Sequence, residues 1–412
     1  MNHYLFLSLA IDSNKTNQSI NDLIKSNIGN LGKISSFDVS PNLLDYNSID
    51  QLVSLTDEVE KMNNTVQSSL TKISRSIKDL SKKIFNDNKI GFQDLVFDKN
   101  YEYIEPPNFY IDMDQEEIQF NEYIDNWKWN VKHFTKKNNI MYLVKRLNKE
   151  LLACEEQLKN SNLSYVESSN KLNNLRKGNQ GSLLVRNLDE FSSKFFYVKS
   201  LNDYYASKTR QQPLYIDTRN LLTIIVVTKK NISHEFIENY QLSENYIIPN
   251  SLVELKREND YCCYAITILR SHLDDYKSIA KGKGWYIRDF HFNPNYREEQ
   301  QIKSEEIVNN YLYETKKHSN DLSYLFSQLS ILCIHIIGIK IFIESILLYG
   351  IKSNFTSISI STTQQNITKI HKKLEDLFGD GYSNLMNEEN EFHSYASYEF
   401  DIENYLPLKF NN

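Results

Sequence analysis

The first long segment with a regular hydrophobic pattern begins near Ser48. Apolar side chains then recur at steps of three and four residues, at Leu52, Leu55, Val59, Met62, Val66, Leu70, Ile73, Ile77 and Leu80. These eight steps cover 28 residues, a mean of 3.5 residues per step, which is the heptad spacing of a coiled coil. Ser48 and Gln51 have the spacing of a capping box. The pattern predicts a long helix that starts at Ser48 and buries one stripe.

A second long helix is predicted from about residue 136 to residue 177. One row of its seam repeats every seven residues, at Val144, Leu151, Leu158, Tyr165 and Leu172. The companion row starts with apolar residues and then passes through Ser161 and Ser168. We expect this half-polar seam to pair with one partner helix rather than to lie in a buried bundle. The 42 residues, at about 1.5 Å each, would form a rod of about 60 Å, so the pattern predicts an elongated neck.

Shorter apolar runs predict strands at both ends and in the middle of the chain. The run 4–11 is typical of a first strand, with a secretory signal peptide as the alternative. The middle is expected to be an α/β unit, because β-branched and apolar runs alternate there with helical patterns. Its predicted strands are 221–228, 261–268 and 285–290, and its predicted helices lie near 234–240 and 271–281. A last strand is predicted near 395–402, and the polar stretch 86–122 is predicted to be a long exposed loop.

The segment from Leu322 to Ile339 has 18 residues without a formal charge, which is at the edge of what a membrane span requires. Ser323, Gln328 and Ser330 interrupt it, and Lys340 follows in the same helical pattern. We therefore expect a core helix, with a membrane span as the alternative. The charged sequence 297–320 before it is predicted to form a return helix along the neck.

Composition and charge exclude several classes of protein. The chain has 412 residues, 47 basic and 53 acidic, for a net charge of −6, whereas nucleic-acid binders usually carry a clustered basic patch. Four cysteines show no metal-ligand spacing and no disulfide framework, which favours a reducing compartment. Lys281-Gly-Lys-Gly284 is typical of a turn rather than of a phosphate loop, and His234-Glu235 lacks the second histidine of a zinc protease. We expect no catalytic residues, no bound cofactor and no metal site.

Several motifs together resemble a known family. They are Asp50–Glu58 in the capped helix, Gly181–Leu188 beyond the second helix, Arg288–Phe290, Ile334–Phe355 and Tyr398–Ile402. The fourth contains Ile334-His335, Lys340-x-Phe342-x-Glu344-Ser345-x-Leu347-x-Tyr349-Gly350 and Asn354-Phe355. In order and spacing they are similar to the C subunit of the eukaryotic vacuolar-type proton-translocating ATPase (V-ATPase), over most of the chain. Against that pattern, Ile337 and Leu348 replace residues that are usually charged, Lys352 replaces a proline, and 86–118 and 199–213 are insertions.

The resemblance implies a helix-rich α+β fold in the form of an elongated dumbbell. The expected division has four parts along the chain. Residues 1–135 form the N-terminal part of the foot, 136–178 a neck helix and 179–297 the head. Residues 298–412 supply the return neck helix and the C-terminal part of the foot. It further implies a non-catalytic stator subunit that bridges the catalytic and membrane sectors of the pump, contributes to vacuolar acidification and controls reversible assembly. The expected location is the cytosolic face of acidic-organelle membranes.

The resemblance also implies partners and contact residues. A peripheral-stalk heterodimer of the E and G subunits would hold the head, and a second E–G pair with the cytoplasmic N-terminal domain of the membrane-sector a subunit would hold the foot; actin is a further candidate partner. Candidate interface residues are Arg186, Asp189, Arg288, Asp289, Glu344, Tyr349 and Asn354. The alternatives are a cytosolic coiled-coil adaptor or actin-binding tether unrelated to the pump, and an enzyme acting through His335 or Asp289.

Overall fold

The computed structural model is helix-rich with small sheets, so the α+β class is confirmed, while the dumbbell outline stays a prediction. The chain divides into two compact units. Unit 1 consists of the described residues of Met1–Lys89, Tyr103–Ser164 and Thr315–Asn412, and unit 2 of those of Ile90–Glu102 and Tyr165–Glu314. The structure describes residues 3–11, 17–39, 44–90, 103–113, 116–129, 139–180, 182–200, 213–241, 246–351, 354–379 and 394–406.

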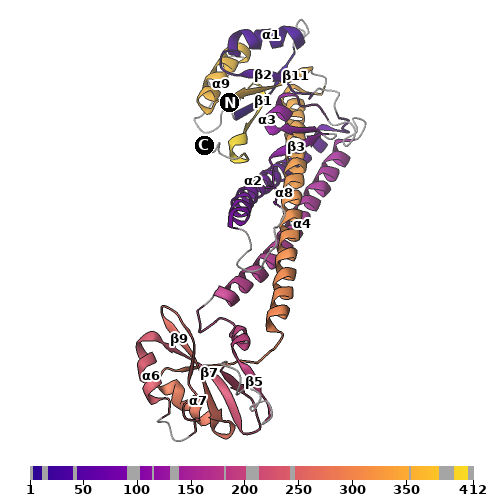
Figure 1. Cartoon of the computed structure of the whole chain (residues 1–412). Coiled ribbons are helices and arrows are strands. Elements are labelled where there is room, and N and C mark those ends of the chain that lie inside the picture. Colours follow the sequence, from indigo (N-terminus) through magenta and orange to yellow (C-terminus); the bar gives the residue numbers. More distant parts are fainter. Residues whose placement is uncertain are drawn as a thin grey trace. The chain divides into compact units, whose positions relative to one another are not determined.

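Unit 1 contains a four-stranded antiparallel sheet that joins the two ends of the chain. Its strand order is β12 (Ala396–Asp401), β1 (His3–Ala10), β11 (Phe355–Thr362) and β2 (Lys33–Ser36). The predicted first and last strands are therefore confirmed, and they are neighbours. Helices α1 (Asn17–Ile28) and α9 (Gln364–Phe378) cover one face of this sheet (Figure 1) and pack against Leu5, Leu7 and Leu9 of β1.

The prediction of a long exposed loop at 86–122 is wrong for the residues that the structure describes there. The helix α2 (Ile49–Ile90) extends into this stretch, and 103–125 contains the hairpin β3 (Tyr110–Met113) and β4 (Glu116–Gln119), followed by α3 (Phe120–Asp125). Ile111 and Phe120 are fully buried. Three serines of the helix α8 (Tyr296–Tyr349) hold this segment. Ser319 donates to the carbonyl of Glu105, and Ser323 and Ser327 accept from the amides of Asn108 and Asp112, respectively. Ser323, which in the sequence seemed only to interrupt an apolar helix, is thus one of its contacts with an extended segment.

Three long helices form the rest of unit 1. They are α2 (Ile49–Ile90), the first part of α4 (Ile140–Gln180) and the second part of α8 (Tyr296–Tyr349). The capping prediction for α2 is confirmed, because the Gln51 amide donates to Ser48 Oγ at 3.2 Å. All nine apolar residues of the predicted stripe, from Leu52 to Leu80, are buried.

The half-polar seam of α4 is more buried than the sequence predicted. In unit 1, α4 contacts two helices, since Glu155 accepts a hydrogen bond from Ser69 of α2 and Ser161 contacts α8. Ser161 Oγ lies 2.8 Å from His318 Nδ1 and donates to Asp321 at 2.7 Å. Burial lowers the pKa of His318 to about 4, so the ring is neutral at pH 7. Ser161 is tolerated in this seam because polar groups on α8 satisfy its hydroxyl.

The apolar segment predicted as a core helix lies within α8. This helix, over Glu298–Tyr349, is long and apolar enough to cross a membrane by length and composition, but 72% of its most apolar window is buried inside the protein. His335 is fully buried between Trp127 and Trp129, with ring centroids 5.3 and 5.1 Å away. Its Nδ1 lies 2.7 Å from the Ile331 carbonyl oxygen, so His335 is a hydrogen-bonded residue of the core. The predicted return helix and core helix are one continuous element.

Unit 2 contains the α/β arrangement expected for the middle of the chain. Its antiparallel sheet has the order β10 (Tyr286–Arg288), β7 (Leu221–Lys229), β9 (Tyr261–Leu269) and β8 (Val253–Arg257). The predicted strands and helices are confirmed, the helices being α6 (Ser233–Asn239) and α7 (Leu273–Gly282). On the other face lie the parallel pair β5 (Phe196–Val198) and β6 (Leu214–Ile216) and the 3₁₀ helix η1 (Asp189–Lys194). Shorter 3₁₀ turns are η2 (Lys230–Ile232), η3 (Arg270–His272) and, in unit 1, η5 (Ile402–Asn404).

The adjacent cysteines of β9 belong to different hydrophobic clusters. Cys262 packs with α6 and α7, and Cys263 packs with η1 and β6, because neighbouring residues of a strand point to opposite faces. Both thiols are free and buried. Burial raises the pKa of Cys263 to about 12, so this thiol stays protonated and poorly reactive at neutral pH.

Candidate functional site

Lys340 is the centre of a charged cluster in unit 1. Its ammonium pairs with Glu60 of α2, lies 4.0 Å from Glu344 Oε1, and sits 4.8 Å from the centroid of the Tyr398 ring. The Tyr398 hydroxyl accepts hydrogen bonds from the side-chain amides of Asn63 and Gln67, at 2.7 and 2.5 Å. This Lys340 cluster therefore joins α2, α8 and β12, three segments that are far apart in the sequence.

Glu344 is the member of the Lys340 cluster whose protonation is most changed by the fold. Burial raises the pKa of its carboxyl to about 7, Lys340 opposes the rise, and Glu60 adds to it. The side chain is 32% exposed, so one edge of the cluster meets solvent. Glu344 was proposed from the sequence as an interface residue, and the structure shows it in contact with Lys340.

We expect Glu344→Gln to stabilise unit 1 above pH 7 and to leave its stability unchanged below pH 4.5. As the pH rises from the usual pKa of 4.5 to about 7, the unfolded chain loses this proton and the folded chain keeps it, so the wild type loses stability over that interval. Partial exposure of the carboxyl offsets part of the effect, which leaves a gain of about 1–2 kcal/mol for the variant.

Urea unfolding of wild type and variant at matched pH values between 4 and 8 measures this difference. Comparing the two at each pH cancels the separate contribution of His318. Glu306→Gln, at an exposed position of the same helix, is the control. Its difference in unfolding free energy from the wild type should not change between pH 4 and pH 8. An unchanged difference between pH 4 and pH 8 would contradict the buried, protonated state of Glu344.

Tyr349 and Asn354, the other two foot candidates, fasten the end of α8 to the sheet. The Tyr349 hydroxyl donates to the Ser8 carbonyl at 2.6 Å, and burial raises the pKa of this hydroxyl to about 12. Gly350 ends the helix with φ of 92°, a left-handed conformation that glycine adopts without strain. The Asn354 carbonyl accepts from the Ile11 amide at 2.8 Å, and its side chain is exposed. Tyr349 thus packs internally, and Asn354 presents its side chain to solvent.

Two of the head candidates, Arg186 and Arg288, face the interior of unit 2. Arg186 is buried and pairs with Glu190 at 3.0 Å and with Glu258 at 3.1 Å. Arg288 donates to the carbonyls of Leu183 and Arg186, at 2.9 and 3.1 Å. These contacts tie the segment 182–190 to strand β10 and to Glu258, which directly follows strand β8. Arg186 was proposed from the sequence as an interface residue, and the structure shows it buried and paired with Glu258, 72 residues away along the chain.

The other two head candidates, Asp189 and Asp289, lie nearer to solvent. Asp189 accepts from the His291 amide at 3.3 Å, while Asp289 is exposed at the end of β10. Asp289 lines a groove of about 370 Å³ along the edge of the sheet. The groove is also lined by Arg288 and by seven residues that were not among the candidate interface residues: Leu184, Lys277, Lys281, Gly284, Trp285, Tyr286 and Ile287. The sequence did contain a sign of this surface, because residues 276–288 include four basic side chains and no acidic one.

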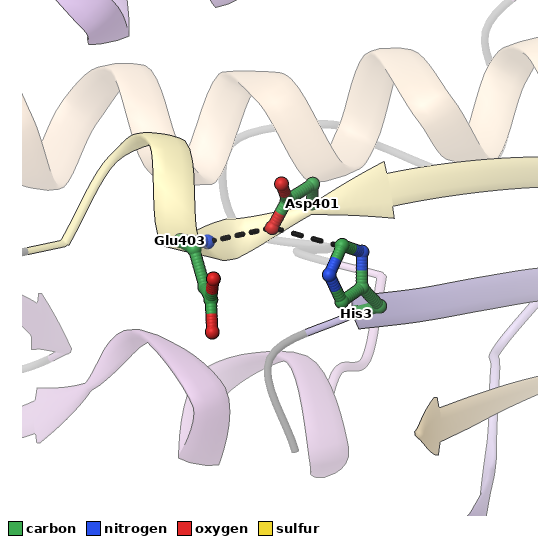
Figure 2. A group of neighbouring side chains, drawn as sticks. All are labelled: His3, Asp401 and Glu403. Carbon is green, nitrogen blue, oxygen red and sulfur yellow. Dashed lines mark hydrogen bonds and ion pairs between the residues drawn. The ribbon is translucent and has the colours of Figure 1, made fainter. Parts of the chain in front are cut away.

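One group of side chains in unit 1 has the composition of a metal site. His3, Asp401 and Glu403 bring their ligand atoms within 4.8 Å of one another. His3 lies opposite Asp401 in the β1–β12 ladder, with Nδ1 3.7 Å from the carboxylate. Figure 2 shows that the contact between Glu403 and Asp401 runs through the backbone nitrogen of Glu403, at 2.9 Å. The same carboxylate accepts from the Asn404 side chain. These two hydrogen bonds at the start of η5 explain the position of the Asp401 carboxylate.

Comparison with known proteins identifies the family. The model of the family described as the C subunit of V-ATPase matches residues 4–405. The chain belongs to the V-ATPase C-subunit family. It is 24% identical to the C 1 subunit of the V-type proton ATPase of Macaca fascicularis, over 85% of this chain and 81% of that protein. It is 23% identical to the C 1-B subunit of the V-type proton ATPase of Danio rerio, over 89% of each.

A solved structure also aligns with the chain, but without support for a shared fold. It is the cytoplasmic N-terminal domain of the I subunit, a homolog of the a subunit, of V-ATPase. The alignment covers 97% of this chain and all of that one at 11% identity, with a TM-score of 0.26. The family assignment rests on the family match, which spans every motif on which the resemblance was based.

Proposed function

We propose that this member of the V-ATPase C-subunit family is a non-catalytic stator subunit of a vacuolar-type rotary proton pump. It would bridge the catalytic and membrane sectors and control their reversible assembly. The observation that carries the proposal is the family match over residues 4–405. Curated relatives named as C subunits of the V-type proton ATPase support it over most of their length. The comparisons give no support to an adaptor or tether unrelated to the pump.

The internal organisation of the chain is consistent with a bridging role. Each unit has its own hydrophobic cluster around its own sheet, so each can offer a separately folded binding surface. Helices α4 and α8 contribute residues to both units. We propose that these helices form the neck, that residues 179–297 form the head, and that residues 1–135 and the end of 298–412 form the foot.

The proposed partners follow from this division. One E–G stalk heterodimer would bind the head, and a second E–G pair with the N-terminal domain of the a subunit would bind the foot; actin is a further proposed partner. Several modest interfaces suit reversible assembly, because losing one lowers the effective concentration that holds the others. The proposed location is the cytosolic face of acidic-organelle membranes. Asn354 and Asp289, whose side chains are exposed, are the most accessible of the proposed contacts.

Depletion of the chain tests the proposed function. Proton pumping into acidic organelles should be abolished, and catalytic sectors should accumulate apart from the membrane. Re-expression of the wild type should restore both. Tyr349→Asp should fail to restore them. It places a charge where the Tyr349 ring packs with its centroid 6.3 Å from that of Phe355, and it removes the hydroxyl that donates to the Ser8 carbonyl.

Tyr349→Phe is the matched control, because it keeps the ring and removes only one hydrogen bond; it should restore pumping. Luminal pH and the sedimentation of the catalytic sector are the two readouts. Affinity purification of the endogenous chain with mass spectrometry should recover the E, G and a subunits. Normal acidification after complete depletion would exclude the stator function.

A further inference from the structure

We propose that the groove beside β10 in unit 2 is the docking site for an acidic, amphipathic helix of a partner protein. The groove, which we call the β10 groove, has a volume of about 370 Å³ and is lined by residues of α7, β10 and the segment before η1. Strand β10 is the edge strand of its sheet. The inference rests on the proposed stator function, since it assigns the head surface that would contact the stalk.

The floor of the β10 groove is apolar. Trp285 is 2% exposed, and Leu184 and Ile287 are half-buried around it. Tyr286 is 42% exposed, and Val185, the chain neighbour of Leu184, is 74% exposed. Apolar side chains that border a concave surface release water when a partner covers them. The floor therefore favours a partner that brings apolar anchors.

The rim of the β10 groove carries more positive than negative charge, because Lys277, Lys281 and Arg288 line it against the one carboxylate among its described lining residues, Asp289. Lys277 and Lys281 line it from α7, and Lys283 lies with its ammonium 4.9 Å from the centroid of the Trp285 ring. The acidic neighbour of Lys277 is Asp274, 3.7 Å away with its side chain 96% exposed, so this pair is weak. Against a chain with a net charge of −6, this local excess of cations selects acidic groups.

The spacing of the rim favours a helix as the occupant. Lys277 and Lys281 are four residues apart on α7, which places their side chains on one face about 6 Å apart along the axis. Acidic side chains one turn apart on a second helix have the same spacing. An added strand is less favoured, because β10 has three residues and offers few backbone groups for pairing. Arg288 is already engaged with the carbonyls of Leu183 and Arg186.

Charge reversal in the full-length chain tests the assignment. Lys277→Glu with Lys281→Glu inverts the rim at two exposed positions, where substitutions seldom affect folding. Lys229→Glu with Lys230→Glu makes the same charge change at exposed positions of the same unit outside the groove. Binding of each protein to a purified recombinant E–G pair is measured by calorimetry at low and at moderate salt.

The rim variant is expected to bind at least ten-fold more weakly than the wild type, and the control within about two-fold. Wild-type affinity should fall as salt rises, and the rim variant should lose most of that dependence. Equal binding by the wild type and both variants would overturn the groove while leaving the stalk function intact. An equal loss of affinity in the rim variant and the control would also overturn it, because the net charge of the chain would then account for the binding. No binding by the wild type would overturn both the groove and the head–stalk contact.

Discussion

Replacing Leu151 with aspartate is expected to lower the free energy of unfolding by on the order of 4 kcal/mol. Leu151 is 1% exposed in the seam that α4 presents to α2 and α8. A carboxylate there loses its hydration without gaining a partner. Because such a group takes up a proton rather than stay charged, the loss should be smaller at pH 5 than at pH 8. Urea unfolding at the two pH values measures both effects.

The neighbouring residue supplies a matched control. Leu152 is 58% exposed, so Leu152→Asp makes the same chemical change one position along the same helix. It should change the free energy of unfolding by less than about 1 kcal/mol. Similar losses for the two variants would show that the seam of α4 has been assigned to the wrong face.

Replacing Phe326 with alanine is expected to cost about 3–5 kcal/mol. Phe326 is fully buried on α8, and its ring centroid lies 5.2 Å from that of Phe109 and 6.0 Å from that of Phe120, both edge to face. The cavity would lie beneath the segment 103–125, which the serines of α8 also hold. We therefore expect the variant both to unfold earlier and to expose this segment to proteases.

Tyr324→Ala is the control for Phe326→Ala, because Tyr324 is 53% exposed two residues earlier on the same helix. It should cost less than about 1 kcal/mol and should leave the proteolysis pattern unchanged. If Phe326→Ala destabilised the protein without faster cleavage in 103–125, the serine contacts alone would be holding the segment. If neither variant had an effect, the packing of this segment on α8 would be wrong.

The candidate interface residues show where sequence reasoning loses information. A motif indicates that a residue matters, and in this chain arginines that looked like surface contacts fasten parts of the fold. Arg186 depends on Glu258 and Arg288 depends on the carbonyl of Leu183, partners more than 70 residues away along the chain. Because local pattern does not report a distant partner, inward-facing and outward-facing candidates could not be separated. The groove beside Asp289 required α7, β10 and the segment before η1 to be placed together.

Local sequence patterns were enough to locate the elements whose cause is local. Helical period and a capping pair located α2, alternating and β-branched runs located β7 and β9, and the motifs from Asp50 to Ile402 indicated the family. Which polar residues are internal could be seen only in the folded chain. Ser161 satisfies His318 and Asp321, Ser319 and Ser323 hold an extended segment, and Lys340 joins three elements. The physical reason is that burying a polar group is unfavourable unless a partner satisfies it, and such partners come from parts of the chain that meet only in the folded protein.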